Sequence, residues 1–321
     1  MIRTAECVSP MHPDKMCDRI SDTLLDLHLE QDPNSRVAIE TCGGMGEVYI
    51  TGEVTSNAVV TRENIVKVVH DITTDDTINV IININSQSSE IANGVDTGGA
   101  GDQGIMIGYA CRDNKEFLPQ EYFLSRELNK FVFDKYPYDG KTQVTMNGNS
   151  LRVVCSFQNA PGKELQKLVM EYFEDYPDYF IEALHCNPAG DWNIGGFTAD
   201  AGLTGRKLAV DNYGPRVPLG GGAFSGKDST KVDRSAAYMG RRIAVDILEE
   251  RPEVNEVMVQ LAYAIGYDQP LQATAIVDGE HEFIKGYDLS PKGIIDFLEL
   301  RKPIFGDSAA FGHMGAGFKW K

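Results

Sequence analysis

The chain has 321 residues, of which 42% are hydrophobic and 24% are charged, so it can bury substantial cores and has room for two or three domains. Its formal net charge of -17 argues against nucleic acid or an anionic membrane as a partner, because the phosphates of either would be repelled. No run of about 18 apolar residues occurs, and no basic start precedes an apolar segment, so we expect a cytoplasmic protein without a membrane span.

Each third of the chain repeats one order of elements: a helix, two alternating strands joined by a turn, and a second helix. In the first third these segments are residues 14–31, 36–41, 47–54 and 61–72. In the second third they are residues 121–135, 142–146, 151–157 and 162–176. In the last third they are residues 232–250, 257–265, 272–277 and 290–300.

This repeat predicts an α+β fold of three similar subdomains about a pseudo-threefold axis, each a β-sheet covered by helices. We set approximate bounds at residues 1–96, 97–193 and 194–321, and we allow segments to exchange between subdomains. The alternative is that the three hairpin signals recur by chance at similar spacings.

Several short segments stand out against this repeat. "MHPDK" places His12 and Asp14 at the start of the first helix, where backbone N–H groups attract anions; the simpler alternative is that Asp14 only caps the helix. "GAGDQG" carries Asp102 among glycines that let the backbone approach a ligand closely. "DGK" and "GLTGRK" each deliver a cation from a loop to the start of a strand, unless both are ordinary turns.

"GGAFSGKD", residues 221–228, departs from the P-loop pattern G-x-x-x-x-G-K-[ST] only at Asp228, which stands where a hydroxyl is required. A P-loop also needs a buried strand leading into its glycines, whereas the preceding "DNYGPRVPL" has the composition of an irregular loop. A P-loop kinase or ATPase is therefore disfavoured. A glycine-rich linker is the other alternative, but residues 206–242 hold eight Lys or Arg and only three Asp, which indicates an anionic ligand.

The segments "HPDK", "GAGDQG", "GLTGRK" and "GGGAFSGKDSTKVDRSAAY" resemble, in the same order over the whole chain, the signatures of the S-adenosylmethionine synthetases (methionine adenosyltransferases). The resemblance implies homodimers or dimers of dimers with active sites between subunits. It also implies attack of the L-methionine sulfur on C5′ of ATP, followed by hydrolysis of the triphosphate to phosphate and pyrophosphate. A non-catalytic homologue that binds ATP or methionine stays an alternative.

This reaction explains why no Ser-His-Asp constellation is evident. A thioether sulfur has no proton to lose, so its attack needs no general base. The difficulty lies in the triphosphate leaving group, whose growing negative charge is stabilised by Lys, Arg and Mg²⁺. In this view residues 221–228 form a phosphate loop that lacks the P-loop hydroxyl, and Lys227 supplies the charge.

The resemblance also assigns roles to single residues. Asp14 and Asp233 would ligate Mg²⁺, with two ions in each site, and Glu40 would hold K⁺. The catalytic residues would be His12, Lys141, Arg206, Lys207 and Lys227, with Arg206 serving triphosphate cleavage. ATP would contact these five together with Asp139, Trp192, Asp200 and Ala223. Methionine would contact Glu53, Gln87, Asp102, Asp200 and Lys231.

Three departures from the family pattern limit this assignment. Met11 stands where the family has glycine, and Asp191 precedes the stacking residue Trp192 where the family has Arg before Phe. The connection "TGG", residues 97–99, is shorter than the family's gate, so we expect a more open site that tolerates longer S-alkyl groups. The six cysteines are scattered without a C-x-x-C pair, a pattern typical of reduced thiols and not of a zinc site.

Overall fold

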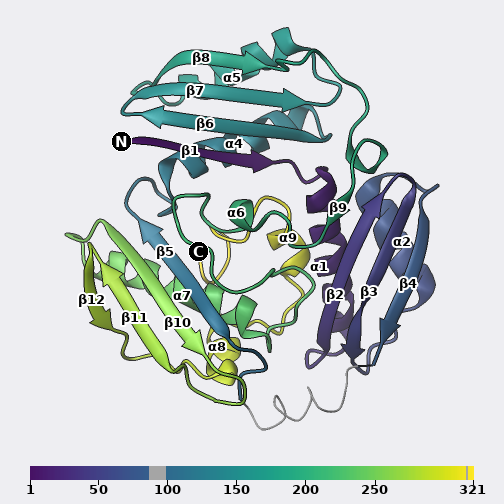
Figure 1. Cartoon of the computed structure of the whole chain (residues 1–321), viewed down its shortest axis with the longest axis vertical. Coiled ribbons are helices and arrows are strands. Elements are labelled where there is room, and N and C mark those ends of the chain that lie inside the picture. Colours follow the sequence, from purple (N-terminus) through teal and green to yellow (C-terminus); the bar gives the residue numbers. More distant parts are fainter. Residues whose placement is uncertain (87–98, 316) are drawn as a thin grey trace.

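A computed structural model describes residues 1–86, 99–315 and 317–321, and all statements below concern these residues. Three four-stranded sheets surround a common centre (Figure 1). The first, sheet A, has the order β1 (Ile2–Val8), β6 (Gly140–Asn147), β7 (Ser150–Phe157) and β8 (Phe180–Cys186). Sheet B has the order β4 (Asn79–Asn85), β3 (Glu47–Thr55), β2 (Arg36–Gly44) and β9 (Gly202–Leu203). Sheet C has the order β12 (Glu280–Phe283), β11 (Gln272–Val277), β10 (Glu256–Tyr263) and β5 (Gly104–Cys111).

Each sheet packs against a long helix and carries a second helix beside it. Sheet B packs on α1 (Pro13–Gln31) with α2 (Arg62–Thr73). Sheet A packs on α4 (Gln120–Lys135) with α5 (Gly162–Glu174), and sheet C packs on α7 (Val232–Glu250) with α8 (Pro291–Leu298). The predicted α+β fold of three sheets covered by helices is confirmed.

All three predicted hairpins are present as antiparallel pairs: β2 with β3, β6 with β7, and β10 with β11. The first turn has positive φ at Met45 (52°) and Gly46 (84°), as a two-residue hairpin turn of the primed type requires. Gly148, in the "NGN" signal, has φ 59°. The local alternation and these turn residues suffice to form the hairpins.

Each third of the chain lends one strand to another third's sheet. From the first third, β1 pairs antiparallel with β6 of the second. From the second third, β5 pairs with β10 of the last, and from the last third, β9 pairs with β2 of the first. The exchange is therefore cyclic, and no sheet is built from one third alone.

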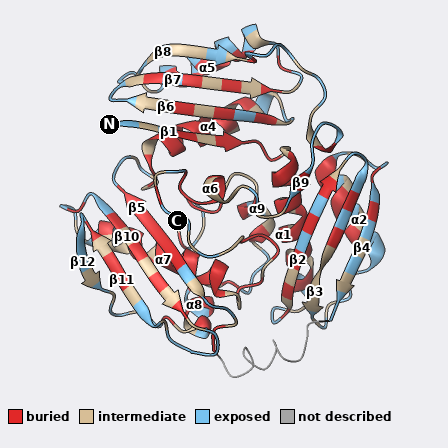
Figure 2. Ribbon diagram, in the orientation of Figure 1, coloured by how far each residue is buried: buried red, intermediate tan, exposed pale blue. Residues whose placement is uncertain are grey.

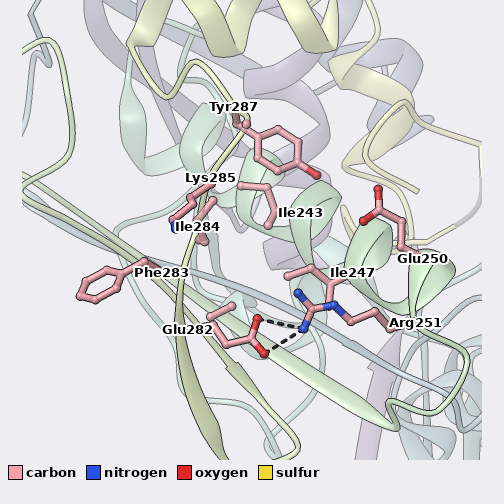
Figure 3. A pocket seen from close by; sticks show the side chains of 11 residues that line it. Ile243, Ile247, Glu250, Arg251, Glu282, Phe283, Ile284, Lys285 and Tyr287 are labelled. Atoms are coloured by element: carbon pink, nitrogen blue, oxygen red, sulfur yellow. Dashed lines mark hydrogen bonds and ion pairs between the residues drawn. The ribbon is translucent and has the colours of Figure 1, made fainter.

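Sheet C differs from the other two in how its edge strand is reached. In sheets A and B a helix follows the hairpin and returns the chain as a parallel strand, β8 or β4. In sheet C, whose residues 272–283 are all described, β12 follows β11 directly and runs antiparallel to it. A cavity of about 650 Å³ opens between α7 and the strands β11 and β12 (Figure 3), and its apolar lining includes Ile243, Ile247, Ala275 and Ile284.

The centre between the sheets holds short elements from the last third: α6 (Leu208–Asp211), α9 (Phe305–Ser308) and the end of the chain. A single 3₁₀ turn, η1 (Gly196–Thr198), lies on the connection between sheets A and B. Buried residues gather on the helices and on the strand faces that they cover (Figure 2). Trp320 is fully buried and stacks on Tyr238 of α7 at 3.9 Å between ring centroids. In the part of the chain that is described, no helix has the length and apolar character needed to cross a membrane.

Candidate active site

Four aspartates spaced by four residues form a stripe along α1, which we call the aspartate ladder. Residues at this spacing lie on one face of a helix. Each carboxylate accepts a hydrogen bond from the backbone of the last third of the chain. The pairs are Asp14 with Leu203 N (3.0 Å), Asp18 with Gly205 N (2.8 Å), Asp22 with Gly226 N (2.8 Å), and Asp26 with Phe305 N (3.1 Å) and Gly306 N (2.7 Å). Helix α1 thus positions the loops that carry the predicted cations.

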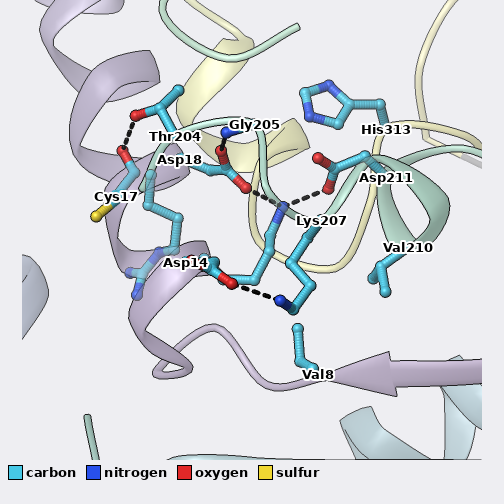
Figure 4. A network of polar contacts seen from close by, with 12 residues as sticks. Val8, Asp14, Cys17, Asp18, Thr204, Gly205, Lys207, Val210, Asp211 and His313 are labelled. Carbon is cyan, nitrogen blue, oxygen red and sulfur yellow. Dashed lines mark hydrogen bonds and ion pairs between the residues drawn. The ribbon is translucent and has the colours of Figure 1, made fainter. Parts of the chain in front are cut away.

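The first group of site residues, the Asp14 group, gathers at the start of α1. Lys207 Nζ donates to Asp14 Oδ2 (Figure 4). Arg206 Nε lies 3.4 Å from Asp14 Oδ1. Burial alone would raise the pKa of Asp14, but the hydrogen bonds and charge of Lys207, with the N–H of Leu203, outweigh it and lower the pKa below its usual value. Asp14 is therefore an ionised carboxylate although it is almost fully buried.

His12 is the N-cap of α1, since its Nδ1 accepts the backbone N–H of Asp14 at 3.2 Å. The simpler alternative, Asp14 as the cap, is wrong: Asp14 is the second residue of the helix. Burial, together with the charges of Lys207 and Lys141, lowers the pKa of His12 to about 4. The neutral ring accepts at Nδ1, so its proton lies on Nε2, which is left as a donor.

Lys141 is the second residue of β6, at the start of the strand as predicted, and its Nζ lies 2.7 Å from Glu6 Oε2 on β1. The similar prediction for "GLTGRK", that its cation reaches the start of a strand, is wrong in part. Its strand, β9, ends at Leu203, and Lys207 instead precedes α6 as the cap residue. The reason is the ladder, which bonds the loop through Leu203 and Gly205 and turns the two cations toward Asp14.

Of the adenosine candidates, Trp192 and Asp200 lie on the connection that follows β8, and Asp139, just before β6, contacts that connection. Asp139 accepts the N–H of Gly196 at 3.0 Å, and burial raises its pKa, with the nearby charge of Asp200 adding to the rise. Trp192 donates from Nε1 to Asn187 at 3.3 Å. Asp191, which replaces the family's arginine, accepts the first N–H of α5, from Gly162, at 2.9 Å, so it stabilises a helix start.

The second group, the Asp233 group, gathers at the start of α7. Asp233 is the second residue of that helix, as Asp14 is of α1. Lys227 Nζ donates to its Oδ2 at 2.6 Å, and Gly222 N donates to its Oδ1 at 3.1 Å. A Cβ on Gly222 would meet Lys227 Nζ at 2.9 Å and Asp233 Oδ2 at 3.0 Å, so a side chain there would require this Asp–Lys pair to shift.

Asp228, the residue that departs from the P-loop pattern, is buried and has a structural role. Its carboxylate accepts the N–H groups of Val37 (2.7 Å) and Thr230 (2.8 Å) and a hydrogen bond from Lys231. Residues 212–219, which precede the glycines, form no strand. The chain therefore lacks both features that define a P-loop.

The remaining predicted residues adjoin these two groups. Glu40 is exposed on β2, on the side opposite to buried Ile39 and Thr41. Glu53 pairs with Ala38, which also bridges to Lys227. Asp102 lies two residues before Gly104, and a Cβ added to Gly104 would be 3.8 Å from Asp233 Oδ1. Ala223 packs on Gly205, since a Cβ added to Gly205 would be 2.4 Å from Ala223 Cβ. The last contact joins the loops of the two groups.

One buried network was missed by the sequence analysis. Lys15, within "HPDK", is fully buried; its Nζ lies 3.1 Å from Asp18 and donates to Asp211 of α6. Burial raises the pKa of Asp18, and the charge of Lys15 opposes this rise. The signal that could have found this network is the spacing D-x-x-x-D-x-x-x-D-x-x-x-D from Asp14 to Asp26.

Two predictions fall outside the described residues. Gln87, assigned to methionine, is one, and Thr97 with Gly98 of the short "TGG" connection is the other. Among the residues that are described, no three His, Cys, Asp or Glu side chains are grouped so as to hold a metal ion. All six cysteines are described, and all are free.

Comparisons with known proteins agree along the whole chain. Residues 1–95 match the profile of "S-adenosylmethionine synthetase, N-terminal domain", residues 97–190 that of the central domain, and residues 194–321 that of the C-terminal domain. The S-adenosylmethionine synthase of Parvibaculum lavamentivorans is 39% identical, with 99% of this chain and 95% of that protein covered. That of Salinibacter ruber is 40% identical over 99% of this chain and 94% of that protein. The solved structure of an unusual S-adenosylmethionine synthetase from Campylobacter jejuni has a TM-score of 0.89 at 33% identity, covering 99% of this chain and 96% of that one.

Proposed function

This chain belongs to the S-adenosylmethionine synthetase family, and on that premise we propose that it makes S-adenosylmethionine from ATP and L-methionine. The observation that carries the proposal is the pair of Asp–Lys groups at the starts of α1 and α7. Each group combines a carboxylate with a cation on a glycine-containing loop. This is the chemistry that a magnesium-bound polyphosphate requires.

The first step forms a bond from the methionine sulfur to C5′ of ATP and breaks the bond from C5′ to the triphosphate oxygen. The electron pair of the broken bond leaves with the triphosphate, and sulfur gains a positive charge, so no proton moves. Neutral His12 has Nε2–H left to donate to an oxygen near the breaking bond. Its depressed pKa keeps the ring neutral at physiological pH.

The cations Lys141, Arg206, Lys207 and Lys227 would hold the departing triphosphate. Each well-placed donor of this kind is worth roughly 10²–10³ in rate. In the free chain Lys207 and Lys227 pair with Asp14 and Asp233, so a polyphosphate would compete for both lysines and free both carboxylates. Arg206, whose side chain is 54% exposed, has the freedom to follow the triphosphate through its cleavage to phosphate and pyrophosphate.

Asp14 and Asp233 fit the role of Mg²⁺ ligands. Asp14 is ionised, and one carboxylate for each ion suffices because Mg²⁺ keeps water and shares oxygens with its substrate. No preformed three-ligand group exists in the described part of the chain, so we propose that two Mg²⁺ ions arrive with ATP. When bound, they would neutralise part of the charge that builds on the triphosphate. Exposed Glu40 would hold K⁺.

The other contacts divide between the two substrates. Asp139, Trp192, Asp200 and Ala223 would surround the adenosine. Glu53, Gln87, Asp102, Asp200 and Lys231 would hold methionine, and Lys231 would have to leave Asp228 to do so. A carboxylate in the methionine pocket would also stabilise the sulfonium as it forms. The six free cysteines accord with a reducing, cytoplasmic compartment.

We further propose that two subunits complete each site and that dimers can pair into tetramers. The support is the exposed face of sheet B, which presents Glu40 and the half-buried Glu53 beside exposed Tyr49 and Ile81. A mixing experiment tests this. If each site takes Asp14 from one subunit and Asp233 from the other, mixing the Asp14→Asn and Asp233→Asn variants should restore about a quarter of the activity. No recovery, in dimers shown to exchange subunits, would place both residues in one subunit.

The activity itself is tested by incubation with ATP, Mg²⁺ and K⁺, with and without methionine, and by identification of the nucleoside product. S-adenosylmethionine that appears only with methionine supports the proposal. ADP would indicate a kinase or ATPase. No product, with binding of ATP or methionine retained, would indicate a non-catalytic homologue.

A further inference from the structure

Asp22, the third acid of the aspartate ladder, differs from the other three because it forms hydrogen bonds to both ends of one loop. Asp22 Oδ1 accepts from Gly226 N at 2.8 Å and from Arg234 Nη1 at 2.6 Å, and Oδ2 accepts from Arg234 Nη2 at 2.8 Å. Gly226 precedes Lys227, and Arg234 follows Asp233. One carboxylate of α1 thus fixes the two flanks of the segment that carries the second group.

Arg234 holds the same loop from inside. Its Nη1 also donates to the carbonyl oxygens of Phe224 (3.0 Å) and Lys227 (3.1 Å), and its Nε donates to Tyr238 Oη at 3.0 Å. Its guanidinium lies 4.1 Å from the centre of the Phe305 ring. The planar guanidinium presents its donors in a fixed fork, so the position of one partner determines the positions of the others.

The loop itself has little room to adjust. Gly226 has φ 79°, and a Cβ there would lie 1.8 Å from the carbonyl oxygen of Ile39. Gly226 O in turn accepts the N–H of Ile39 at 3.0 Å. Because the carbonyl of Lys227 points inward to Arg234, the Lys227 side chain is left to reach Asp233 on the outside.

Neither Asp22 nor Arg234 can touch a substrate, since both side chains are fully buried. We propose that these two residues, the Asp22–Arg234 clamp, are positioning residues that set Lys227 and Asp233 at the distance a polyphosphate requires. This inference rests on the proposed function, in which Lys227 holds the triphosphate. The clamp should therefore affect polyphosphate binding and catalysis but not the binding of methionine.

The test compares Asp22→Asn with Asp26→Asn. In either orientation, the amide introduced by Asp22→Asn would set a donor against Arg234 or Gly226 and break the clamp. Asp26 is the matched control: it is the next acid of the ladder, and it holds Phe305 and Gly306, which carry no site residue. Arg234→Lys, which keeps the charge but loses the fork, replaces Asp22→Asn if that variant does not fold.

The primary readout is binding of inorganic tripolyphosphate with Mg²⁺ by calorimetry, at a temperature where melting curves show every variant folded. We expect Asp22→Asn to weaken this binding by about tenfold or more and to lower kcat, with the KM for methionine within about twofold. Asp26→Asn should leave binding, kcat and both KM values within about twofold. In a background that carries both Lys227→Met and Asp233→Asn, Asp22→Asn should weaken binding by less than about threefold, because both residues that it positions are gone.

Equal losses from Asp22→Asn and Asp26→Asn would refute the proposed role of the clamp. A full additional loss from Asp22→Asn in the background that lacks both Lys227 and Asp233 would refute it too. Because the readout is binding, it does not depend on the activity assay. If the unmodified protein makes no S-adenosylmethionine, the proposed function fails while the clamp is still decided.

Discussion

The starts of α1 and α7 differ sharply from the start of α4, although the three helices occupy equivalent places against their sheets. Each helix has an acid as its second residue: Asp14, Asp233 and Glu121. Asp14 and Asp233 each meet a lysine from a glycine-containing loop. Glu121 meets none; its Oε2 has no hydrogen-bond partner among the described residues, and burial raises its pKa.

The arginines nearest to Glu121 are committed elsewhere. Arg216 lies 2.8 Å from Asp113, and Arg3 lies 3.3 Å from the same carboxylate. The threefold scaffold thus supplies a buried acid three times, and the facing loop decides what each acid can do. A lysine-bearing loop holds the acid in an ion pair that a ligand can replace, whereas the absence of such a loop leaves a carboxyl group that favours its proton.

The largest effect should come from removing the two charged acids. Asp14→Asn and Asp233→Asn should each lower kcat for S-adenosylmethionine formation by about 10³-fold or more, because each removes a proposed metal ligand at the leaving group. Glu121→Gln, the same change at the third position, should leave kcat within about twofold. Near-normal activity of either aspartate variant at low Mg²⁺ would show that the metal assignment is wrong.

A smaller effect is expected from the arginines. Arg206→Leu should slow triphosphate cleavage by about 10²-fold with little change in the KM for methionine, because its cation follows the polyphosphate. Arg216→Leu, the matched change beside the third acid, should leave cleavage unaltered. Steady-state assays with tripolyphosphate alone and with methionine separate these outcomes. A large rise in the methionine KM, with normal cleavage, would contradict the placement of Arg206.

The charge state of His12 offers a finer test of the Asp14 group. Its pKa of about 4 arises from burial and from the cations Lys207 and Lys141, so its ring should stay neutral as the pH falls to about 5. In Lys207→Met one of those cations is gone, and the pKa should move up toward 6.5. NMR titration of the His12 ring, assigned with His12→Asn, measures both values. An unchanged His12 pKa in Lys207→Met would show that the charge of Lys207 does not act on His12.

The smallest expected effect is on stability at Glu121. Burial raises the pKa of Glu121 in the folded chain above the ordinary value of 4.5. The stability that the protonated Glu121 contributes is therefore fully present below pH 4.5, and it is lost as the pH rises through the raised pKa. The glutamine of Glu121→Gln does not ionise, so this variant avoids the loss of stability. The difference in melting temperature between the variant and the unmodified chain should therefore increase with pH. At pH 8 the Glu121→Gln variant should therefore melt at a slightly higher temperature than the unmodified chain. A difference that is constant with pH would refute a raised pKa.

Sequence reasoning found what local patterns determine. The hairpins and helices follow from alternation, periodicity and turn residues such as Gly148, all of which act over a few neighbours. It did not find β4 and β8, whose parallel partners lie across a helix, or the role of Asp228. An acid in a phosphate-loop pattern predicts repulsion, and only the fold shows Val37 N and Lys231 satisfying it.

In the candidate site, too, the sequence showed what lies within short motifs but not what depends on distant contacts. The motifs located Asp14, Asp233 and their lysines, because both partners of each pair lie in recognisable segments. The sequence did not show that His12 is the helix cap, because histidine is not among the residues preferred at that position. It could not show that Lys15 is buried, because Lys15 pairs with Asp211, which is distant in sequence. The four-residue spacing of the aspartates was visible, but only the structure gives each of them its partner.

The cyclic strand exchange has a consequence for how this chain reaches its native state. Sheet A is complete only when β1 meets β6, whose Cα partners run from Ile2 with Asn147 to Val8 with Lys141, and sheets B and C likewise wait for β9 and β5. A ribosome must therefore release most of the polypeptide before any sheet closes, and such distant pairings make folding slow. A fragment cut at 95 or at 190 would expose an unpaired sheet edge, which invites aggregation. The three segments are thus one cooperative unit, which should melt in a single transition.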